Sequence, residues 1–596
     1  MDAGAVAGCL RDKTVLVTGS TGYLGKLMVE KILRVQPDVK KVYLLVRAPD
    51  AASAEQRILT QVKWICVIAF DHTSYMQCYG HGLTFSCIVL GKDLFNTLRE
   101  KHGLAGFQKL IKEKIVPLAG DVGTRNFGLD SSTSDDLCQE IDVIVHGAAT
   151  TSFYERILEW RWKYRNRGDN INIRDTWLRS DFWGSTALNL SLEEPGEHCC
   201  KSSTKLTGYP YSHDKSMRVA YILPPSWYDV ALASNALGAQ YGCEFAKKCP
   251  NLKLLLHVST AFVAGTQEGL LLEKALKMGE ALRPGCHLDI EAELQLVEKV
   301  KAELAEAKSG GSDQSSEKIA MKELGFKRAC HFGWPNVYTF TKAMGEMLLE
   351  QQRGDLPVVI IRPTMVTSTY QDPFPGWIEG ARTIDALIVA YNEQAFPCFV
   401  GDRNDTMDAV PADMVVNATL VAMAVHWNEK GQVIYHVSSA IRNPLTGQVL
   451  EDVCWDYFSI HPRVLENGKP LENRRPYVFK RFAYFRAYLI LMYKLPLEIL
   501  HAVSVLLCGL FSQCYNKHNR RYTFLMLLVK LYAPYAFFKG CFDDTNLTRL
   551  RKEVKMDGKD GSLFNFDPKS MDWHSYLLNV HVPAVLMYGR KNKGSV

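Results

Sequence analysis

The sequence predicts an α/β fold, in which a doubly wound parallel sheet is followed by a mainly helical C-terminal domain. Short apolar runs alternate with helical segments through the first 440 residues, an order that covers a parallel sheet with helices. A glycine-rich turn, TGSTGYLG at 18–25, directly follows the first run, TVLV. From residue 481 the chain becomes rich in Leu, Tyr and Phe, with basic residues between them. We therefore divide it into a sheet domain at 1–440, a connecting segment at 441–480 and a C-terminal domain at 481–596.

Six apolar runs are predicted to be strands of this sheet. They lie at 14–18, 41–46, 115–118, 142–146, 253–259 and 357–363. Helices are predicted from apolar residues at helical spacing, and they lie at 22–35, 229–248, 290–308 and 336–353. The first two strands and the helix between them form a βαβ unit. The segment SGGSDQSS at 309–316 is predicted to be a flexible surface loop.

Two stretches do not fit this alternation. Residues 62–90 are apolar and aromatic without a clear period, and residues 157–227 mix Trp with Arg and contain turn-forming sequences. We interpret both as loop-like insertions in the sheet domain.

Charge and cysteine content limit the classes of partner. The net charge is only +6, with basic and acidic residues mixed, which does not indicate a nucleic-acid partner. The 16 cysteines are scattered, without a CxxC pair or the ligand spacing of a zinc site. We therefore expect no metal, and free thiols in a reducing compartment.

The glycine-rich turn predicts a nucleotide site. Gly19, Gly22 and Gly25 allow the backbone to turn tightly and to approach a pyrophosphate at the N-terminus of the next helix. A tight turn without a ligand would also need glycines, but the position between a strand and a helix favours a nucleotide. The second strand ends in LLVR, so Arg47 stands where an acidic residue would bind the ribose of NAD. An arginine there can pair with the 2′-phosphate of NADP, so we expect NADPH; a solvated surface arginine is the alternative.

Two further motifs indicate proton transfer beside the nucleotide. In VYTFTK, Tyr338 and Lys342 are four residues apart and share one face of the predicted helix. A free tyrosine has a pKa of about 10, and a neighbouring ammonium group would lower that pKa and ease proton exchange. The motif HVSTAF places Ser259 and Thr260 at the carboxyl edge of the sheet, where ligands bind. An amphipathic helix surface and a strand-end turn are the respective alternatives.

Taken together, these motifs resemble the extended short-chain dehydrogenase/reductase superfamily and, within it, the alcohol-forming fatty acyl-CoA reductases of the plant type. The remaining motifs follow in the expected order: VPLAGDV at 116–122, HGAATTSFYER at 146–156, HVSTAFV at 257–263, PNVYTFTKAMGE at 335–346, IIRPTMVTSTYQDPFPGWIEG at 360–380 and VPADMVVNA at 410–418. The region from 481 onward resembles the C-terminal domain of that family. The resemblance implies a Rossmann fold of the extended type, and it covers most of the chain outside 62–90 and 157–227.

The resemblance also implies a role for each matching residue. The catalytic residues would be Thr260, Tyr338 and Lys342, with Ser259 the less favoured hydroxyl. The phosphate loop would consist of Thr18, Gly19, Ser20, Thr21, Gly22, Tyr23, Leu24 and Gly25. The rest of the cofactor would lie against Arg47, Asp121, Val122, Ala148, Ala149, Thr150, Asn235, Pro363 and Thr364, with Asn235 supporting the lysine through water.

The implied reaction is the reduction of a long-chain fatty acyl-CoA by NADPH to an aldehyde and then to a primary alcohol, for wax, cutin, suberin or other lipid synthesis. Two alternatives are a product that stops at the aldehyde and a substrate carried by an acyl carrier protein. A nucleotide-sugar epimerase would share the glycine motif, but the stretch PTMVTSTYQDPFPGW and the apolar tail speak against it.

The sequence departs from the family pattern at the second insertion. In the family FYER continues directly into YDVAL, whereas here Arg156 and Tyr228 flank the inserted segment. The segment would separate the fourth strand from its helix, beside the cofactor. An alternative prediction is therefore that Ala148, Ala149 and Asn235 are displaced and that the chain is an inactive, lipid-associated protein.

The C-terminal domain predicts contact with a membrane. Aromatic and basic residues interleave with apolar runs there, as in segments at a membrane interface; an ordinary helical core is the alternative. The nearest candidate for a membrane segment, 495–511, is short and contains Glu498, so it could also be a short embedded hairpin. With the resemblance, we expect peripheral attachment to the cytosolic face of the endoplasmic reticulum membrane, with a cytoplasmic location as the alternative.

Overall fold

A computed structural model describes residues 1–59, 93–150, 227–306, 314–380, 382–394, 397–465, 468–554 and 561–591. The two predicted insertions, 62–90 and 157–227, lie outside the described residues except for Trp227.

The core of the described chain is a seven-stranded parallel sheet. In spatial order its strands are β12 (Gln432–Val437), β7 (Val358–Pro363), β5 (Leu254–Val258), β4 (Val143–His146), β1 (Thr14–Thr18), β2 (Lys41–Val46) and β3 (Ile115–Ala119). All six predicted strands are present, with ends that differ by at most one residue from the prediction. The strand order reverses between β1 and β4, and such a switch point is where open α/β sheets bind nucleotides. The predicted α/β fold is confirmed.

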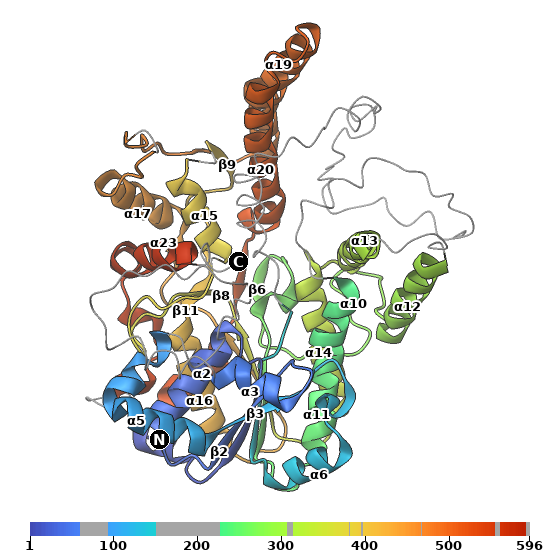
Figure 1. Cartoon of the computed structure of the whole chain (residues 1–596), viewed down its shortest axis with the longest axis vertical. Coiled ribbons are helices and arrows are strands. Elements are labelled where there is room, and N and C mark those ends of the chain that lie inside the picture. The colour runs from blue at the N-terminus through green and yellow to red at the C-terminus, as the bar shows by residue number, and fades with distance from the viewer. Residues whose placement is uncertain are drawn as a thin grey trace, which may run out of the picture.

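Helices cover both faces of the sheet because neighbouring strand residues point to opposite faces. On β1, Val15 and Val17 are buried in the cluster that contains helix α2 (Tyr23–Val35) and helix α16 (Ala412–Val425). Leu16, between them, is buried with residues of α11 (Gly238–Lys248) and α14 (Val337–Gln352). Figure 1 shows α2 and α16 on one side of the strands and α11, α14 and α6 (Ser131–Glu140) on the other.

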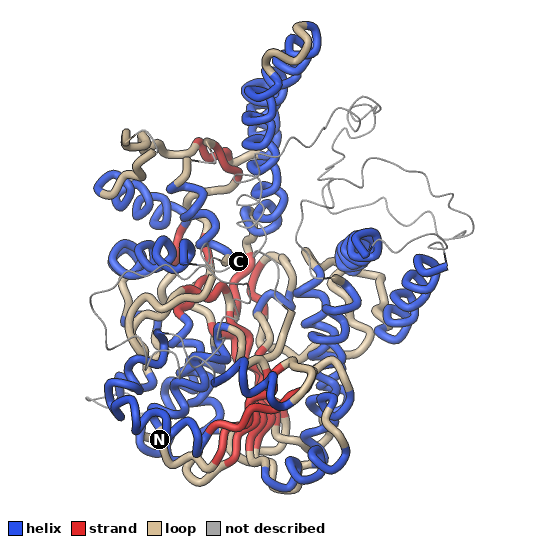
Figure 2. The backbone as a smooth tube through the Cα atoms, viewed as in Figure 1, coloured by secondary structure: helices blue, strands red, loops and turns tan. Residues whose placement is uncertain are grey.

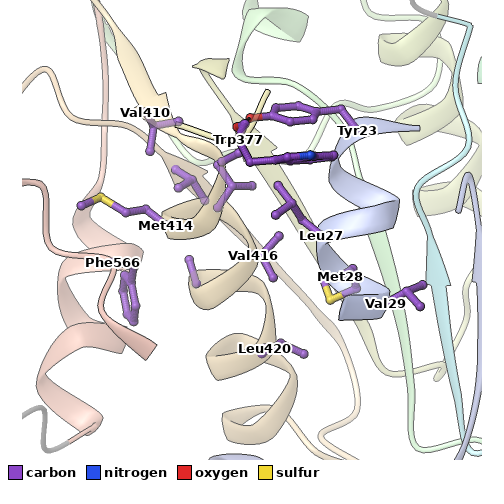
Figure 3. Packing of buried hydrophobic residues seen from close by; sticks show 14 of the residues in the cluster. Tyr23, Leu27, Met28, Val29, Trp377, Val410, Met414, Val416, Leu420 and Phe566 are labelled. Atoms are coloured by element: carbon purple, nitrogen blue, oxygen red, sulfur yellow. Dashed lines mark hydrogen bonds between the residues drawn. The ribbon is translucent and has the colours of Figure 1, made fainter. Parts of the chain in front are cut away.

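Apolar packing of α2 against α16 and Trp377 fixes the place where the glycine-rich turn becomes a helix. Leu27 and Met28 of α2 lie toward Val416 and Leu420 of α16 (Figure 3). Tyr23, the first residue of α2, stacks on Trp377 with ring centroids 5.1 Å apart, and its hydroxyl donates to the Trp377 carbonyl at 3.0 Å. This apolar contact anchors the first turn of α2.

The predicted helices are also present, and one of them differs in form. The helix predicted at 229–248 consists of α10 (Tyr228–Ala231), a π-helical segment η3 (Leu232–Leu237) and α11. The amphipathic segment is α12 (Ile290–Glu306), as predicted. Of the loop predicted at 309–316, residues 309–313 lie outside the described residues, and the prediction is wrong for 314–316, which belong to α13 (Gln314–Phe332).

After the sheet domain the chain leaves the body as a helical hairpin and then returns. Its outgoing arm is α18 (Phe482–Leu489), the π-helical η5 (Ile490–Lys494) and α19 (Leu495–Leu506), and its returning arm is α20 (Ser512–Ala536). The two arms project beyond the other helices (Figures 1 and 2). Among the described residues, the continuous helix Phe482–Leu506 is long and apolar enough to cross a membrane by length and composition. It is longer than the predicted 495–511 because α18 and η5 extend it at the N-terminal end.

The segment after the hairpin packs back onto the sheet domain. Helix α21 (Thr545–Glu553) lies beside β12 and α16, and α23 (Val582–Lys591) lies beside α15 (Thr383–Asn392). Trp573 and Leu577 are buried in the same cluster as Val15. Within the described part of this C-terminal region, the hairpin is therefore the part that extends away from the sheet domain.

Candidate active site

The glycine-rich turn forms a cradle for a phosphate group. Gly19 has a positive φ of 75°, and a Cβ on Gly25 would lie 2.2 Å from the Gly19 carbonyl oxygen. Gly22 caps α2 without a side-chain hydrogen bond, which leaves the helix N-terminus open toward the cavity. The buried Ser20 hydroxyl has no hydrogen-bond partner among the described residues. Open backbone N–H groups and a spare hydroxyl fit a pyrophosphate.

A cavity of about 440 Å³ crosses the carboxyl ends of the strands. All the predicted site residues line it except Ser20 and Asn235: they are Thr18, Gly19, Thr21, Gly22, Tyr23, Leu24, Gly25, Arg47, Asp121, Val122, Ala148, Ala149, Thr150, Thr260, Tyr338, Lys342, Pro363 and Thr364. Residues at or just after the carboxyl ends of six strands, β1, β2, β3, β4, β5 and β7, are thus brought to one place.

Two arginines lie where the cavity meets the end of β2. The Arg47 guanidinium binds Asp121 through two of its nitrogens, with Nε to Oδ2 at 2.8 Å and Nη2 to Oδ1 at 3.2 Å. Arg57, from α3 (Ala51–Leu59), also lines the cavity and donates to the Arg47 carbonyl. The sequence analysis missed Arg57, although a second arginine ten residues after Arg47 was a usable signal.

The strand end at β4 is held in place by Asn235. Its Oδ1 accepts from the Thr150 N–H at 2.8 Å, and its Nδ2 donates to the Thr341 hydroxyl at 3.0 Å. The Ala148 N–H donates to the Thr18 hydroxyl at 3.2 Å. The π-helical turn that carries Asn235 is a feature often found at functional sites. In the structure Ala148 and Ala149 line the cavity, so the displacement considered from the sequence is not observed.

Tyr338 and Lys342 face the cavity together from α14. Asn336 caps this helix by accepting from the Thr339 N–H at 2.9 Å. Lys342 is buried, and its Nζ donates to the Val258 carbonyl at 2.8 Å. Burial lowers the pKa of Lys342 to about 8, against the opposing charge of Glu346.

The predicted effect of Lys342 on the tyrosine is not what this structure shows. Loss of solvent raises the pKa of Tyr338 to about 12, and the cation that opposes the shift is Arg382. The physical reason for the correction is burial, which disfavours the phenolate more than nearby positive charge favours it. At neutral pH Tyr338 is therefore protonated and can donate.

The two hydroxyls at the end of β5 have different surroundings. Ser259 donates to Glu346, which is paired with Arg362 through Nε to Oε1 at 3.0 Å. Both members of this ion pair are almost fully buried. The Thr260 hydroxyl has only long contacts, 3.3 Å from the Phe262 N–H and 3.5 Å to the Pro363 carbonyl. Thr260 is thus the hydroxyl that can turn to a substrate.

A buried histidine pair lies behind Lys342. His146 and His257 are neighbours on β4 and β5, and their rings stack with centroids 5.2 Å apart. Burial, reinforced by the Lys342 charge, lowers the pKa of His146 to about 3. Both rings are neutral at physiological pH, because the pKa of His257 is also far below its usual value.

Sequence reasoning missed two contributors at the edge of the site. Arg382 lines the cavity, with its guanidinium 5.2 Å from the centre of the Tyr23 ring. Tyr535, near the end of α20, accepts from Asn336 Nδ2 at 2.7 Å. No motif signals these contacts, because each joins segments far apart in the sequence. Among the described residues no group of His, Cys, Asp and Glu side chains could hold a metal ion.

Comparison with known proteins places this chain in a family. An NAD-binding family model described as male sterility protein matches residues 17–77, 85–161 and 225–419, and a second model with the same description matches 492–592. The chain is 40% identical to fatty acyl-CoA reductase 1 of Arabidopsis thaliana, over 97% of this chain and 98% of that protein. It is 36% identical to the alcohol-forming fatty acyl-CoA reductase of Simmondsia chinensis, over 98% and 99% of the two chains. Among solved structures, the reductase domain of a nonribosomal peptide synthetase from Mycobacterium tuberculosis matches at 16% identity, over 100% of this chain and 97% of that chain, with a TM-score of 0.46.

Proposed function

Because the chain belongs to the fatty acyl-CoA reductase family, we propose that it reduces a long-chain fatty acyl-CoA to the primary alcohol with NADPH. The observation that carries the proposal is the placement of Tyr338, Lys342 and Thr260 on one cavity that also contains the glycine cradle. A phosphate cradle and a proton donor on the same cavity are what a nicotinamide-dependent reductase needs.

The residues of this chain would act on the thioester carbonyl. Thr260 and the protonated Tyr338 would donate hydrogen bonds to its oxygen, where negative charge develops in the transition state. A bound nicotinamide cofactor would supply the hydride. Tyr338 would then give its proton to the oxygen, which yields a hemithioacetal, and loss of the CoA thiol leaves an aldehyde. Once a second NADPH had replaced the oxidised cofactor and Tyr338 had regained a proton from solvent, the same donors would serve a second round, in which the aldehyde gains a hydride and a proton and becomes the alcohol.

Lys342 would hold the cofactor ribose and stabilise the phenolate that Tyr338 becomes. Its burial places the ammonium group in surroundings of low polarity, where its field is strong. Asn235 would keep Thr150, and with it the nicotinamide side of the cavity, in position through the 2.8 Å bond.

The choice of NADPH over NADH rests on Arg47 and Arg57. Both line the cavity at the end of β2, and guanidinium groups bind phosphate in bidentate fashion. Asp121 now holds Arg47, so a 2′-phosphate would have to share or replace that contact. We expect Arg47→Ala to raise the KM for NADPH at least tenfold and to leave the KM for NADH unchanged.

We further propose that the protein works at the cytosolic face of the endoplasmic reticulum membrane. The exposed apolar hairpin and the water-insoluble product of the proposed reaction support a membrane location. Fluorescence microscopy of the tagged full chain with an endoplasmic reticulum marker tests this, and a uniformly cytosolic signal would contradict it.

Product analysis by gas chromatography tests the reaction. The full chain, a version lacking 62–90 and 157–227, the variant Tyr338→Phe and the exposed control Tyr477→Phe are expressed in yeast. We expect fatty alcohol from the full chain and from Tyr477→Phe, and none from Tyr338→Phe. The interruption of the family match at 162–224 supports treating that segment as an addition. Alcohol from the shortened version alone would mean that the added segments block activity, and aldehyde without alcohol would point to a single reduction.

A further inference from the structure

The tip of the hairpin exposes apolar side chains that nothing in the described structure covers. Residues 495–511 contain one charged residue, Glu498. Their exposed large apolar side chains are Leu495, Ile499, Val503, Val505, Leu506, Leu507, Leu510 and Phe511. An apolar pocket of about 380 Å³, lined by Leu495, Pro496, Ile499, Leu500, Val503 and Phe511, opens among them. A patch of this kind on a soluble protein marks a surface that binds another apolar phase.

Basic residues greatly outnumber acidic residues in the hairpin. Residues 481–536 contain seven Lys and Arg residues and one acidic residue, a net charge of +6. The whole chain also has a net charge of +6, so the rest of the protein is neutral in sum. All seven basic residues lie outside the tip: Arg481, Arg486 and Lys494 precede it, and Lys517, Arg520, Arg521 and Lys530 follow it. Basic residues next to an apolar insertion are typical of contact with anionic lipid headgroups.

The geometry excludes a helix that crosses the membrane. Phe485 and Leu489, at the start of the outgoing arm, are buried against Cys398 and Val400 of the body. The chain reverses at Cys508 and Gly509, which both have positive φ angles, and α20 returns beside α19. The twelve residues of α19 extend about 18 Å, roughly half of a hydrocarbon core that is about 30 Å thick. The hairpin can therefore enter and leave on the same side.

We propose that the tip 495–511 inserts into one leaflet of an anionic lipid bilayer, with the basic residues nearest to it, Lys494, Lys517 and Arg520, at the headgroups. This goes beyond the proposed location by fixing the inserted segment, its depth and the charge of the lipid. It shares the membrane with the proposed function but does not depend on reductase activity.

Helix α20 connects the inserted tip to the catalytic site. It runs from Ser512 beside the tip to Tyr535, whose hydroxyl accepts from the cap of the catalytic helix. The 23 residue steps between them correspond to about 35 Å. A rigid rod of this length would hold the cavity above the headgroups, at a fixed height from the acyl chains in the leaflet.

Flotation of the purified full chain with vesicles tests the lipid and the segment. The vesicles are phosphatidylcholine alone or phosphatidylcholine with a minority of phosphatidylserine. We expect tighter binding to the anionic vesicles, and at least about tenfold weaker binding after Lys517→Glu with Arg520→Glu, since each basic residue near an anionic surface contributes about 1 kcal/mol. The matched control is Lys299→Glu with Lys430→Glu, two exposed lysines on the body. Equal binding by the two charge variants would overturn the proposal.

A second pair of variants tests the apolar tip. Leu506→Asp is compared with Ile460→Asp, because the two side chains are 80% and 70% exposed and neither substitution empties a core. We expect only Leu506→Asp to abolish flotation. If the tip instead covers a second copy of the chain, Leu506→Asp will change the molecular mass in solution and leave flotation intact, which contradicts insertion.

Protease treatment of the bound vesicles tests the depth. A tip in one leaflet leaves residues 1–480 and 537–596 accessible from the same side, whereas a spanning helix would protect one of them inside the vesicle. Reduction of a short, soluble acyl-CoA by Leu506→Asp separates the two proposals, because we expect that activity to persist when flotation is lost. Loss of alcohol formation in the unmodified chain with intact flotation would contradict the proposed function alone.

Discussion

Two long helices, α14 and α20, meet at the active site, and they are built for opposite surroundings. Twelve of the sixteen residues of α14 are buried, including Lys342 and Glu346. Helix α20 is exposed at its N-terminal end and becomes buried only near Leu525, Val529 and Tyr532. The two helices touch through Asn336 and Tyr535 at 2.7 Å.

The comparison shows that this protein buries titratable side chains on α14 and leaves apolar side chains exposed on the hairpin. On α14, burial shifts the pKa of Tyr338 up and that of Lys342 down, so the tyrosine stays protonated and the lysine is poised near neutrality. Along the hairpin the apolar side chains remain outside, where they are available to a lipid phase. In our two proposals, the chemistry depends on α14 and the placement of the molecule at a membrane depends on α20.

The largest expected effect is on kcat, and it differs between Tyr338 of α14 and Tyr535 of α20. Tyr338→Phe removes the proton donor, and we expect kcat for acyl-CoA reduction to fall by about 10²–10⁴-fold. Tyr535→Phe removes only a hydroxyl that accepts from Asn336, so a loss of less than about tenfold is expected. Steady-state kinetics on both variants measures this, and equal losses would show that α20 takes part in the chemistry.

The buried ion pair on α14 should matter far more to stability than a pair at the surface. Glu346→Ala leaves Arg362 charged and buried, and should reduce the free energy of unfolding by about 3–5 kcal/mol. Asp355→Ala breaks the exposed pair with Lys430 and should change it by less than about 1 kcal/mol. Guanidinium denaturation followed by circular dichroism measures both values. Similar values for the two variants would mean that solvent reaches the pair.

The pH dependence of stability tests the burial of Lys342. Its pKa is about 8 in the folded protein and near 10.5 in the unfolded chain, so between these values the unfolded state binds the extra proton. The contribution of Lys342 to the free energy of unfolding should therefore become more favourable, by up to about 1.4 kcal/mol per pH unit, as the pH rises from 8 to 10. The difference between wild type and Lys342→Met isolates this contribution, because the other groups cancel. A difference that is constant over this range would place the ammonium group in contact with solvent.

The smallest expected effect is at the contact between the helices. Asn336→Ala removes the cap of α14 and should reduce the free energy of unfolding by about 1 kcal/mol. Thermal unfolding measures this loss, with Tyr484→Phe, an exposed residue of α18, as a control expected to have no effect. A much larger loss would show that Asn336 holds the C-terminal segment as well as the helix.

The sequence predicted the fold well wherever burial leaves a local pattern. The strands are buried on both faces and therefore appear as continuous apolar runs, such as TVLVT and VVIIRP. Within the seven-stranded sheet the sequence analysis missed β12, because Gln432 and His436 interrupt its apolar run. The glycine turn and Tyr338 were found because their spacing itself is the signal.

Other parts of the site depend on contacts that no local pattern records. Arg382 lines the cavity and Tyr535 contacts the cap of α14, and both lie more than forty residues away from Tyr338 in the sequence. The direction of the Tyr338 pKa shift was predicted wrongly because it depends on the solvent lost around the hydroxyl, which a helical spacing does not reveal. Ser259 could be ranked below Thr260, but its bond to Glu346 became visible only in the fold.

The charge of the hairpin also affects how the molecule would approach a surface. The whole hairpin, 481–536, carries the net charge of +6, and the rest of the chain sums to zero. The protein is therefore an electric dipole with its positive end at the projecting hairpin. Near a negative surface such a dipole experiences a torque within about one Debye length, roughly 8–10 Å at physiological ionic strength. Diffusing molecules would therefore turn the hairpin toward the surface before contact. Raising the salt concentration would slow productive collisions without changing the depth to which the tip inserts.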